Sequence, residues 1–198
     1  MIKAVIFDLG GVLFTDGTKK FIQYLKDAYS LNEDAVKEAL DGQIGTAYRE
    51  AKISRDEFWN KVKEKLKIKE NINYLEDKWI DGYEVITGTK LLLFELKKKY
   101  KIYFLSDNVK ERVDRLNDKF HFISWFDGGI FSHEVGFRKP NPQIYKMIMA
   151  KAKVGPGEGV YIDDKPALLE PAKALGLVAF VFETPEKLRK ELHTIGVL

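Results

Sequence analysis

The chain has 198 residues, enough to bury a sizeable hydrophobic core in one domain, or in one domain with a modest insertion. Hydrophobic residues make up 45% of it and charged residues 32%, a balance typical of globular proteins and not of disordered ones. The mild net charge of +3 predicts no nucleic-acid-binding surface, and the absence of cysteine excludes disulfides, thiolate catalysis and cysteine-ligated zinc.

Targeting and membrane signals are also missing from the sequence. No apolar run reaches the length of a membrane span, and Met1 leads directly into strand residues without the pattern of a signal peptide. We therefore expect a soluble, cytoplasmic protein, a monomer or a homodimer, with no nucleic-acid partner and no membrane partner.

The first predicted element is a strand over residues 2–7, an apolar, β-branched run typical of a central strand in a parallel sheet. Asp8 ends this strand, where open α/β sheets bind their ligands. Gly10 and Gly11 allow the backbone to turn sharply beside it. Asp8 is therefore a candidate catalytic residue, although an aspartate taken alone at such a place is equally typical of a turn or a helix cap.

A helical insertion follows this strand. Between residues 18 and 88 the β-branched runs give way to apolar residues at the spacing of amphipathic helices. Asn32 is a predicted cap for the second of these helices, and Ser54 with Glu57 forms the capping-box pattern ahead of another. A further helix is predicted over residues 72–82.

From Gly88 onward, strands and helices alternate regularly. Predicted strands cover 101–105, 129–132, 159–163 and 178–182, and predicted helices cover 89–100, 109–119, 142–152, 166–175 and 185–193. Such alternation predicts parallel strands joined by right-handed crossovers, and hence an α/β fold with a doubly wound sheet. We therefore predict a core domain made of residues 1–14 and 88–198 and a helical cap domain over residues 15–87.

Four different short stretches lie at predicted strand ends and loops, namely FDLGGVL at 7–13, FLSDN at 104–108, RKP at 138–140 and YIDD at 161–164. In this order they make the sequence resemble the haloacid dehalogenase superfamily, a phosphatase-rich group of hydrolases. FDLGGVL is similar to the branch that includes sugar-phosphate phosphatases. The resemblance implies a Rossmann-like sheet with the first strand central, the second and third on one side, and the fourth and fifth on the other. The helical cap would then cover the site.

The resemblance also implies residue roles. Asp8 would be the nucleophile and form an aspartyl-phosphate that water later hydrolyses, while Lys139 would supply fixed positive charge. Ser106, Asp107 and Lys139 would bind the substrate phosphate. Taken singly, Ser106 could instead be a helix cap and Lys139 a surface lysine.

Adjacent carboxylates at Asp163 and Asp164 end another predicted strand, and they repel one another unless a cation lies between them and Asp8. Mg²⁺ prefers such hard oxygen ligands and keeps its other positions for water and phosphate. We therefore predict a magnesium site with Asp8 and Asp164 as direct ligands and Asp163 bound directly or through water. By the resemblance, the backbone carbonyl of Gly10 completes the protein ligands.

The sequence departs from the phosphatase pattern at two positions. Gly10 stands where these enzymes usually carry a second aspartate that serves as general acid and base. Leu168 stands where Asn or Asp often supports the lysine and the metal. Asp16 could lend an acid instead, although a solvated turn acid is its more common role.

We therefore predict a magnesium-dependent phosphatase that acts on a small phosphorylated metabolite, such as a sugar phosphate, through an aspartyl-phosphate. Two alternatives stay open. A metal-independent 2-haloacid dehalogenase needs no proton for its halide leaving group, so Gly10 would be harmless there. A non-catalytic protein could instead bind phosphate or metal and use the cap as an interaction surface.

Overall fold

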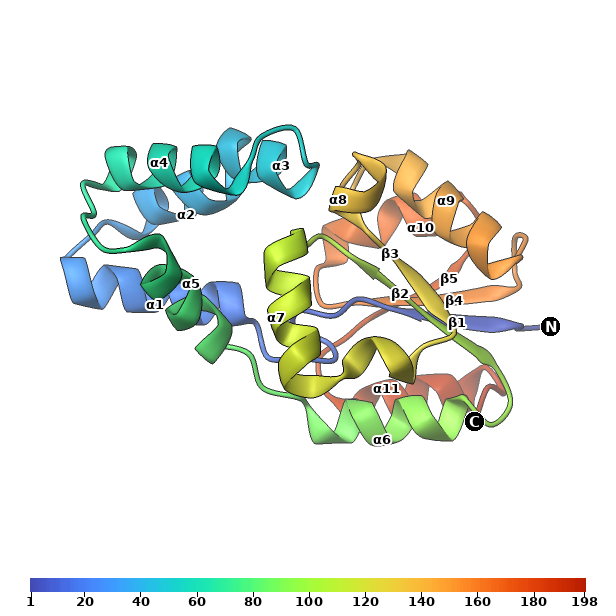
Figure 1. Ribbon diagram of the computed structural model, residues 1–198. Helices are drawn as coiled ribbons and strands as arrows, with labels where there is room; N and C mark the ends of the chain where they lie inside the picture. Colours follow the sequence, from blue (N-terminus) through green and yellow to red (C-terminus); the bar gives the residue numbers. More distant parts are fainter.

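The computed structural model describes residues 1–198 and has a parallel five-stranded sheet at its centre (Figure 1). The strands are β1 (Ala4–Phe7), β2 (Lys101–Ser106), β3 (Gly128–Phe131), β4 (Gly159–Asp163) and β5 (Val178–Val181). Their order is β3-β2-β1-β4-β5, so the first strand is central and the winding direction changes between β1 and β4. The predicted α/β fold and doubly wound strand order are confirmed.

The central position of β1 follows from its composition. All four of its residues are fully buried, and Val5 lies between Ile102 of β2 and Val160 of β4 in the two parallel ladders. A strand that is covered on both faces buries a continuous apolar run instead of an alternating one. The sheet therefore holds the carboxyl end of β1, where Asp8 follows, rigidly between two neighbours.

Two layers of helices cover the sheet (Figure 1). On one face Val5 and Phe7 contact the core formed with α6 (Thr87–Leu96), α7 (Lys110–Phe120) and α11 (Pro185–Thr194). On the other face Ala4 and Ile6 contact the core formed with α9 (Pro142–Ala152) and α10 (Glu170–Ala174). Alternate residues of one strand thus feed two separate hydrophobic cores.

The insertion forms five helices beside the carboxyl edge of the sheet (Figure 1). They are α1 (Gly17–Tyr29), α2 (Glu33–Asp41), α3 (Gln43–Arg49), α4 (Arg55–Leu66) and α5 (Ile72–Asp81). Their buried faces meet at a cluster of aromatic rings, in which Phe21 stacks on Trp79 with ring centroids 4.7 Å apart. The rings bury large apolar areas and hold the short helices together. The division into domains at residues 14 and 88 stays a prediction.

The predicted caps form. The Asn32 side chain accepts hydrogen bonds from the first turn of α2, and Ser54 accepts one from the backbone N–H of Glu57 at the start of α4. The Glu57 carboxylate binds Lys61 instead of returning to Ser54, so only half of the capping box is present. These side chains satisfy backbone N–H groups that have no partner inside the helix.

One predicted helix is wrong in its continuity. Residues 166–175 form a 3₁₀ turn, Pro166–Leu168, followed by the separate helix α10. Pro171 lies in the first turn of α10, where a backbone N–H would have no partner inside the helix, so a proline is tolerated there.

No helix of the structure combines the length and the apolar character that crossing a bilayer requires.

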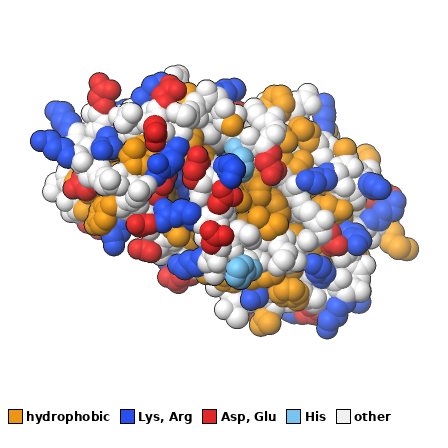
Figure 2. Space-filling model, in the orientation of Figure 1, with side chains coloured by type: hydrophobic (Ala, Val, Ile, Leu, Met, Phe, Trp, Pro, Cys, Tyr) orange, Lys and Arg blue, Asp and Glu red, His pale blue; other side chains and the backbone are white.

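The visible surface carries no block of a single charge. Figure 2 shows Lys and Arg side chains interspersed with Asp and Glu over this face of the molecule. Mixed surface charges of this kind give only weak long-range fields.

Candidate active site

A cavity of about 1070 Å³ lies between the carboxyl ends of the central strands and the inserted helices. Asp8, Gly10, Ser106 and Lys139 line it from the core. Of its 28 lining residues only 6 are hydrophobic, so the cavity suits a polar, charged ligand better than an apolar one. The residues predicted from separate stretches of the chain therefore meet at one place.

Lys139 is the centre of the site. Its ammonium lies 2.9 Å from Asp8 Oδ1 and 2.7 Å from Asp163 Oδ2, and it donates a hydrogen bond of 3.1 Å to the Tyr161 hydroxyl. Each of its three N–H donors thus has an acceptor. Burial alone would lower the pKa of Lys139, but the Asp163 and Asp8 carboxylates hold it well above its usual range. The site therefore contains a permanent positive charge beside Asp8.

Asp107 fixes the loop that carries this lysine. Its carboxylate accepts a hydrogen bond of 3.0 Å from the backbone N–H of Lys139 and one of 3.3 Å from Arg138. Arg138 extends toward the inserted helices, where it donates to Thr46 and to Asp41. The structure thus gives the Asp107 carboxylate a role in holding the loop, and its predicted contact with substrate stays a prediction.

Ser106 ends β2 and is buried, yet it lines the cavity and its hydroxyl has no hydrogen-bond partner within the protein. The helix that follows, α7, begins after Val109 without a side-chain cap, so Ser106 is not a helix cap. Its hydroxyl is free to donate to a ligand oxygen in the cavity.

Asp163 is fully buried and engaged at both oxygens. Oδ2 accepts hydrogen bonds from Lys139 and, at 2.5 Å, from Tyr161, while Oδ1 accepts one of 2.9 Å from the backbone N–H of Lys165. Burial alone would raise the pKa of Asp163, but Lys139 and these hydrogen bonds hold it below its usual range. Of the two predicted roles for Asp163 at a metal, contact through water fits these engaged oxygens better than direct ligation.

Tyr161 is a residue of this site that the sequence did not reveal. It precedes Asp163 by two positions on β4, so the two side chains lie on the same face of the strand. Its hydroxyl accepts a hydrogen bond from Lys139 and donates one to Asp163. Leu168, which stands where an Asn or Asp often supports the lysine, makes only a hydrogen bond from its carbonyl, which accepts from Tyr145. A hydroxyl on an otherwise apolar buried strand is the sequence signal that could have revealed it.

The carboxylates fit a divalent cation. Asp8, Asp163 and Asp164 each place an oxygen within 4.8 Å of the others, and Asp164 Oδ1 is buried with no hydrogen-bond partner. The carbonyl of Gly10, in the turn that follows Asp8, also accepts no hydrogen bond within the protein. Burial raises the pKa of Asp8 to about 7 and that of Asp164 to about 6. Buried carboxylates with free oxygens and raised pKa values are stabilised in their ionised form by a bound cation.

The two glycines of the turn differ in what they require. Gly11 has a φ of +83°, and a Cβ there would lie 2.5 Å from Asp164 Oδ2, so only glycine lets Asp164 approach the turn. At Gly10 a Cβ would meet nothing within 4 Å, and φ is not positive. Glycine at position 10 is therefore not demanded by the backbone.

Asp16 has the common role expected for a turn acid. Its side chain accepts a hydrogen bond of 2.9 Å from the backbone N–H of Lys19 and caps α1. The residue also lines the cavity, so its carboxylate is a candidate substitute for the acid that Gly10 lacks.

Comparisons with known proteins agree with this geometry. Residues 2–176 match the family model described as haloacid dehalogenase-like hydrolase. A D-ribitol-5-phosphate phosphatase from Bacteroides thetaiotaomicron is 24% identical over 209 residues, which cover 98% of each chain.

Two solved structures share the fold. A HAD family enzyme from Bacteroides thetaiotaomicron, in complex with magnesium and inorganic phosphate, has a TM-score of 0.78 and 25% identity, covering 92% of this chain and 95% of that one. L-2-haloacid dehalogenase from Xanthobacter autotrophicus has a TM-score of 0.67 and 19% identity, covering 100% of this chain and 85% of that one. The second likeness is one of fold alone.

Proposed function

The chain belongs to the haloacid dehalogenase-like hydrolases, and from this premise we propose that it is a magnesium-dependent phosphatase of small phosphorylated metabolites. The observation that carries the proposal is the buried Asp8 carboxylate, held 2.9 Å from Lys139 at the floor of a polar cavity and beside two further aspartates. A nucleophile, a fixed positive charge and ligands for a hard cation are the parts that phosphoryl transfer needs.

In this proposal Asp8 attacks phosphorus, the bond between phosphorus and the leaving oxygen breaks, and the phosphoryl group stays on Asp8 until water hydrolyses it. Lys139 and the Ser106 hydroxyl offset the charge of the phosphoryl oxygens. A Mg²⁺ held by Asp8, Asp164 and the Gly10 carbonyl would keep Asp8 ionised and hold the phosphate beside it. The leaving oxygen takes its proton from water or from Asp16, since Gly10 has no acid to give.

A phosphorylated carbohydrate is the substrate class that we favour. The cavity is large enough for a small sugar phosphate and is lined mainly by polar residues. One relative that matches over nearly the whole length of both chains is a D-ribitol-5-phosphate phosphatase. The open polyol chain of such a substrate presents hydroxyls that polar walls can bind.

A 2-haloacid dehalogenase is the second candidate, because a halide leaves without a proton and Gly10 offers none. The cluster of Asp8, Asp163 and Asp164 weighs against it, since that reaction has no use for a cation. The unpaired buried oxygen of Asp164 weighs against it as well.

The test is turnover of a panel of phosphate esters and 2-haloacids by the purified protein, with Mg²⁺ and with a chelator. We expect hydrolysis of phosphate esters only with Mg²⁺ and no release of halide. Halide release in chelator would establish the dehalogenase instead. A properly folded protein that turns over neither class would refute the phosphatase and leave a phosphate- or metal-binding role.

A further inference from the structure

Arg112 differs from every other arginine of the chain. Among the six arginines it alone has no carboxylate oxygen within 4.0 Å. It is also buried, with 8% of its surface exposed, whereas the other buried cations, Arg49 and Lys139, each have a carboxylate partner. A buried guanidinium without a counter-ion is costly, so its environment calls for an explanation.

The position of Arg112 connects it to the active site. Arg112 and Leu116 are four residues apart on α7 and both line the cavity that contains Asp8, as does Asn108 just before the helix, so this face of α7 forms part of the cavity wall. Arg112 is one helical turn beyond Asn108, which follows directly on the Ser106-Asp107 pair at the end of β2. Arg112 thus lies along the wall from the residues predicted to bind the phosphoryl group.

The guanidinium is held in place but not saturated. Its central carbon lies 3.7 Å from the centroid of the Trp79 ring, so the aromatic face of α5 fixes the plane of the group. Its protein hydrogen bond is a long one, 3.4 Å from Nη1 to the Asn108 side-chain oxygen. Most of the five N–H donors are therefore left for another partner.

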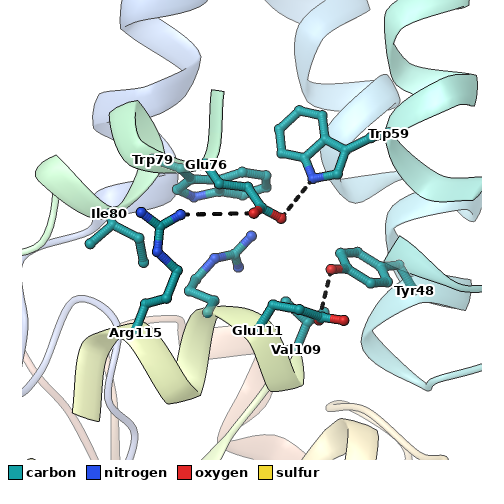
Figure 3. Close-up of a pocket in the computed structure, with 9 residues that line it drawn as sticks. Tyr48, Trp59, Glu76, Trp79, Ile80, Val109, Glu111 and Arg115 are labelled. Atoms are coloured by element: carbon teal, nitrogen blue, oxygen red, sulfur yellow. Dashed lines mark hydrogen bonds and ion pairs between the residues drawn. The ribbon is translucent and has the colours of Figure 1, made fainter. Parts of the chain in front are cut away.

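Acidic side chains on the far side of Arg112 are already engaged. Figure 3 shows Glu76 bound to Trp59 and Arg115, and Glu111 bound to Tyr48. The void that these residues enclose is about 10 Å³, room for at most a single water. A counter-ion for Arg112 can therefore come only from the large cavity on the other side.

We propose that Arg112 binds a second anionic group, a carboxylate or another phosphate, on the leaving-group part of the substrate. The proposal rests on the phosphatase function and narrows it to phosphate esters that carry this extra charge. A planar guanidinium with free donors matches both anions, because each offers two coplanar oxygens. The scissile phosphoryl group is served by Lys139 and Ser106, so Arg112 acts on the remainder of the molecule.

The test compares matched pairs of esters in the presence of Mg²⁺. The first pair, 3-phosphoglycerate and glycerol 3-phosphate, differs in a carboxylate, and the second, fructose 1,6-bisphosphate and fructose 6-phosphate, differs in a phosphate. We expect the anionic member of at least one pair to have a kcat/KM about tenfold higher or more, the range typical of a charged hydrogen bond. The pair that shows the effect identifies the anion.

Variants assign the preference to Arg112. Arg112→Met should lower kcat/KM for the anionic ester by about tenfold or more and that for the neutral ester by less than about threefold. Arg115→Met is the matched control, one turn away on α7 and outside the cavity lining, and should leave the ratio unchanged. If Arg112→Met does not fold, the ratio of kcat/KM values within each pair, measured on the unchanged protein, still tests the inference. Arg112→Lys, which keeps the charge, then replaces Arg112→Met as the variant.

Two outcomes would overturn the inference, namely equal kcat/KM within both pairs, or an equal loss on both members in Arg112→Met, which would mark a structural role. The proposed phosphatase function is judged separately by turnover of the neutral esters. If no ester is hydrolysed, calorimetry of the same four compounds with Asp8→Asn and Mg²⁺ tests the site by binding alone. Equal affinities within both pairs would again refute it.

Discussion

Replacing Gly10 by aspartate should raise the activity of the protein on phosphates with poor leaving groups. A Cβ at this position meets nothing within 4 Å, and the residue lines the same cavity as Asp8 and Lys139. The backbone needs no positive φ there, so the strain that would oppose the change is absent. The new side chain can therefore enter the cavity as an acid and base for the leaving group and the water.

The charges around position 10 would raise the pKa of the new carboxyl group. Three carboxylates and one ammonium already surround the turn, and their net of two negative charges when all are ionised would be offset by a bound Mg²⁺. At an effective dielectric of about 20, one carboxylate roughly 6 Å away disfavours ionisation by about 3 kcal/mol, or roughly two pKa units. A nearby carboxylate therefore raises the pKa of the new aspartate toward the range of a general acid at neutral pH, and a bound Mg²⁺ would limit this rise.

A positioned acid is worth roughly 10²–10⁴-fold, but the surroundings of Gly10 are not shaped around a side chain, so we expect about tenfold in kcat on alkyl phosphates. Aryl phosphates should gain less, because their leaving oxygen departs without protonation. The assay is kcat for both ester types with Mg²⁺, together with the melting temperature.

Two controls separate the acid from other effects. Gly10→Asn has the same shape without the acid and should give no gain. Gly11→Ala controls for a disturbed turn. It adds no acid but should weaken Mg²⁺ binding, because its Cβ would collide with Asp164. A stable Gly10→Asp variant that binds Mg²⁺ normally but gains nothing on alkyl phosphates would refute the reasoning and make Asp16 the next candidate for the proton donor.

Three further predictions follow from the same site. Asp8→Asn should leave the fold intact and reduce kcat by roughly 10³-fold or more; retention of a tenth of the activity would exclude the aspartyl-phosphate. Tyr161→Phe removes one acceptor from Lys139 and one donor from Asp163, so thermal melts should show a free energy of unfolding lower by about 1–3 kcal/mol, and kcat should fall. Unchanged stability and kcat would show that Tyr161 does not support Lys139 and Asp163. Burial raises the pKa of Asp8 to about 7 and that of Asp164 to about 6, so the folded state binds more protons than the unfolded state between about pH 4 and 7. The melting temperature in chelator should therefore fall as pH rises through this window, and Mg²⁺ should reduce the fall; equal slopes with and without Mg²⁺ would contradict a cation at these carboxylates.

The strand order and the meeting of the site residues were predictable because both follow from strong local signals. A buried apolar run that ends in an acid specifies a central strand and its edge, and β4 begins and ends at the predicted residues 159 and 163. Asn32 and Ser54 mark helix starts because their side chains act on the backbone a few residues away.

The helix α3 has no such local signal and is not predicted, because it has only seven residues and no side-chain cap.

Contacts between distant residues also leave no local signal in the sequence. Tyr161 and Arg112 both occupy positions that also suit ordinary core or surface side chains. The role of each depends on partners far away in the sequence, Lys139 for one and Trp79 for the other, which only the folded chain brings together.

The central place of β1 has a consequence for how the chain folds. Ala4 pairs with Lys101 on one side and with Gly159 on the other, so β1 is synthesised long before its second neighbour, β4. Pairings between residues so far apart in the chain form slowly, because a long loop must close before any contact rewards it. Until residue 159 has been synthesised, the apolar stretch at the amino terminus remains an open strand edge. The nascent chain must therefore protect this edge from association during most of its synthesis, either by early packing of the inserted helices or by a chaperone.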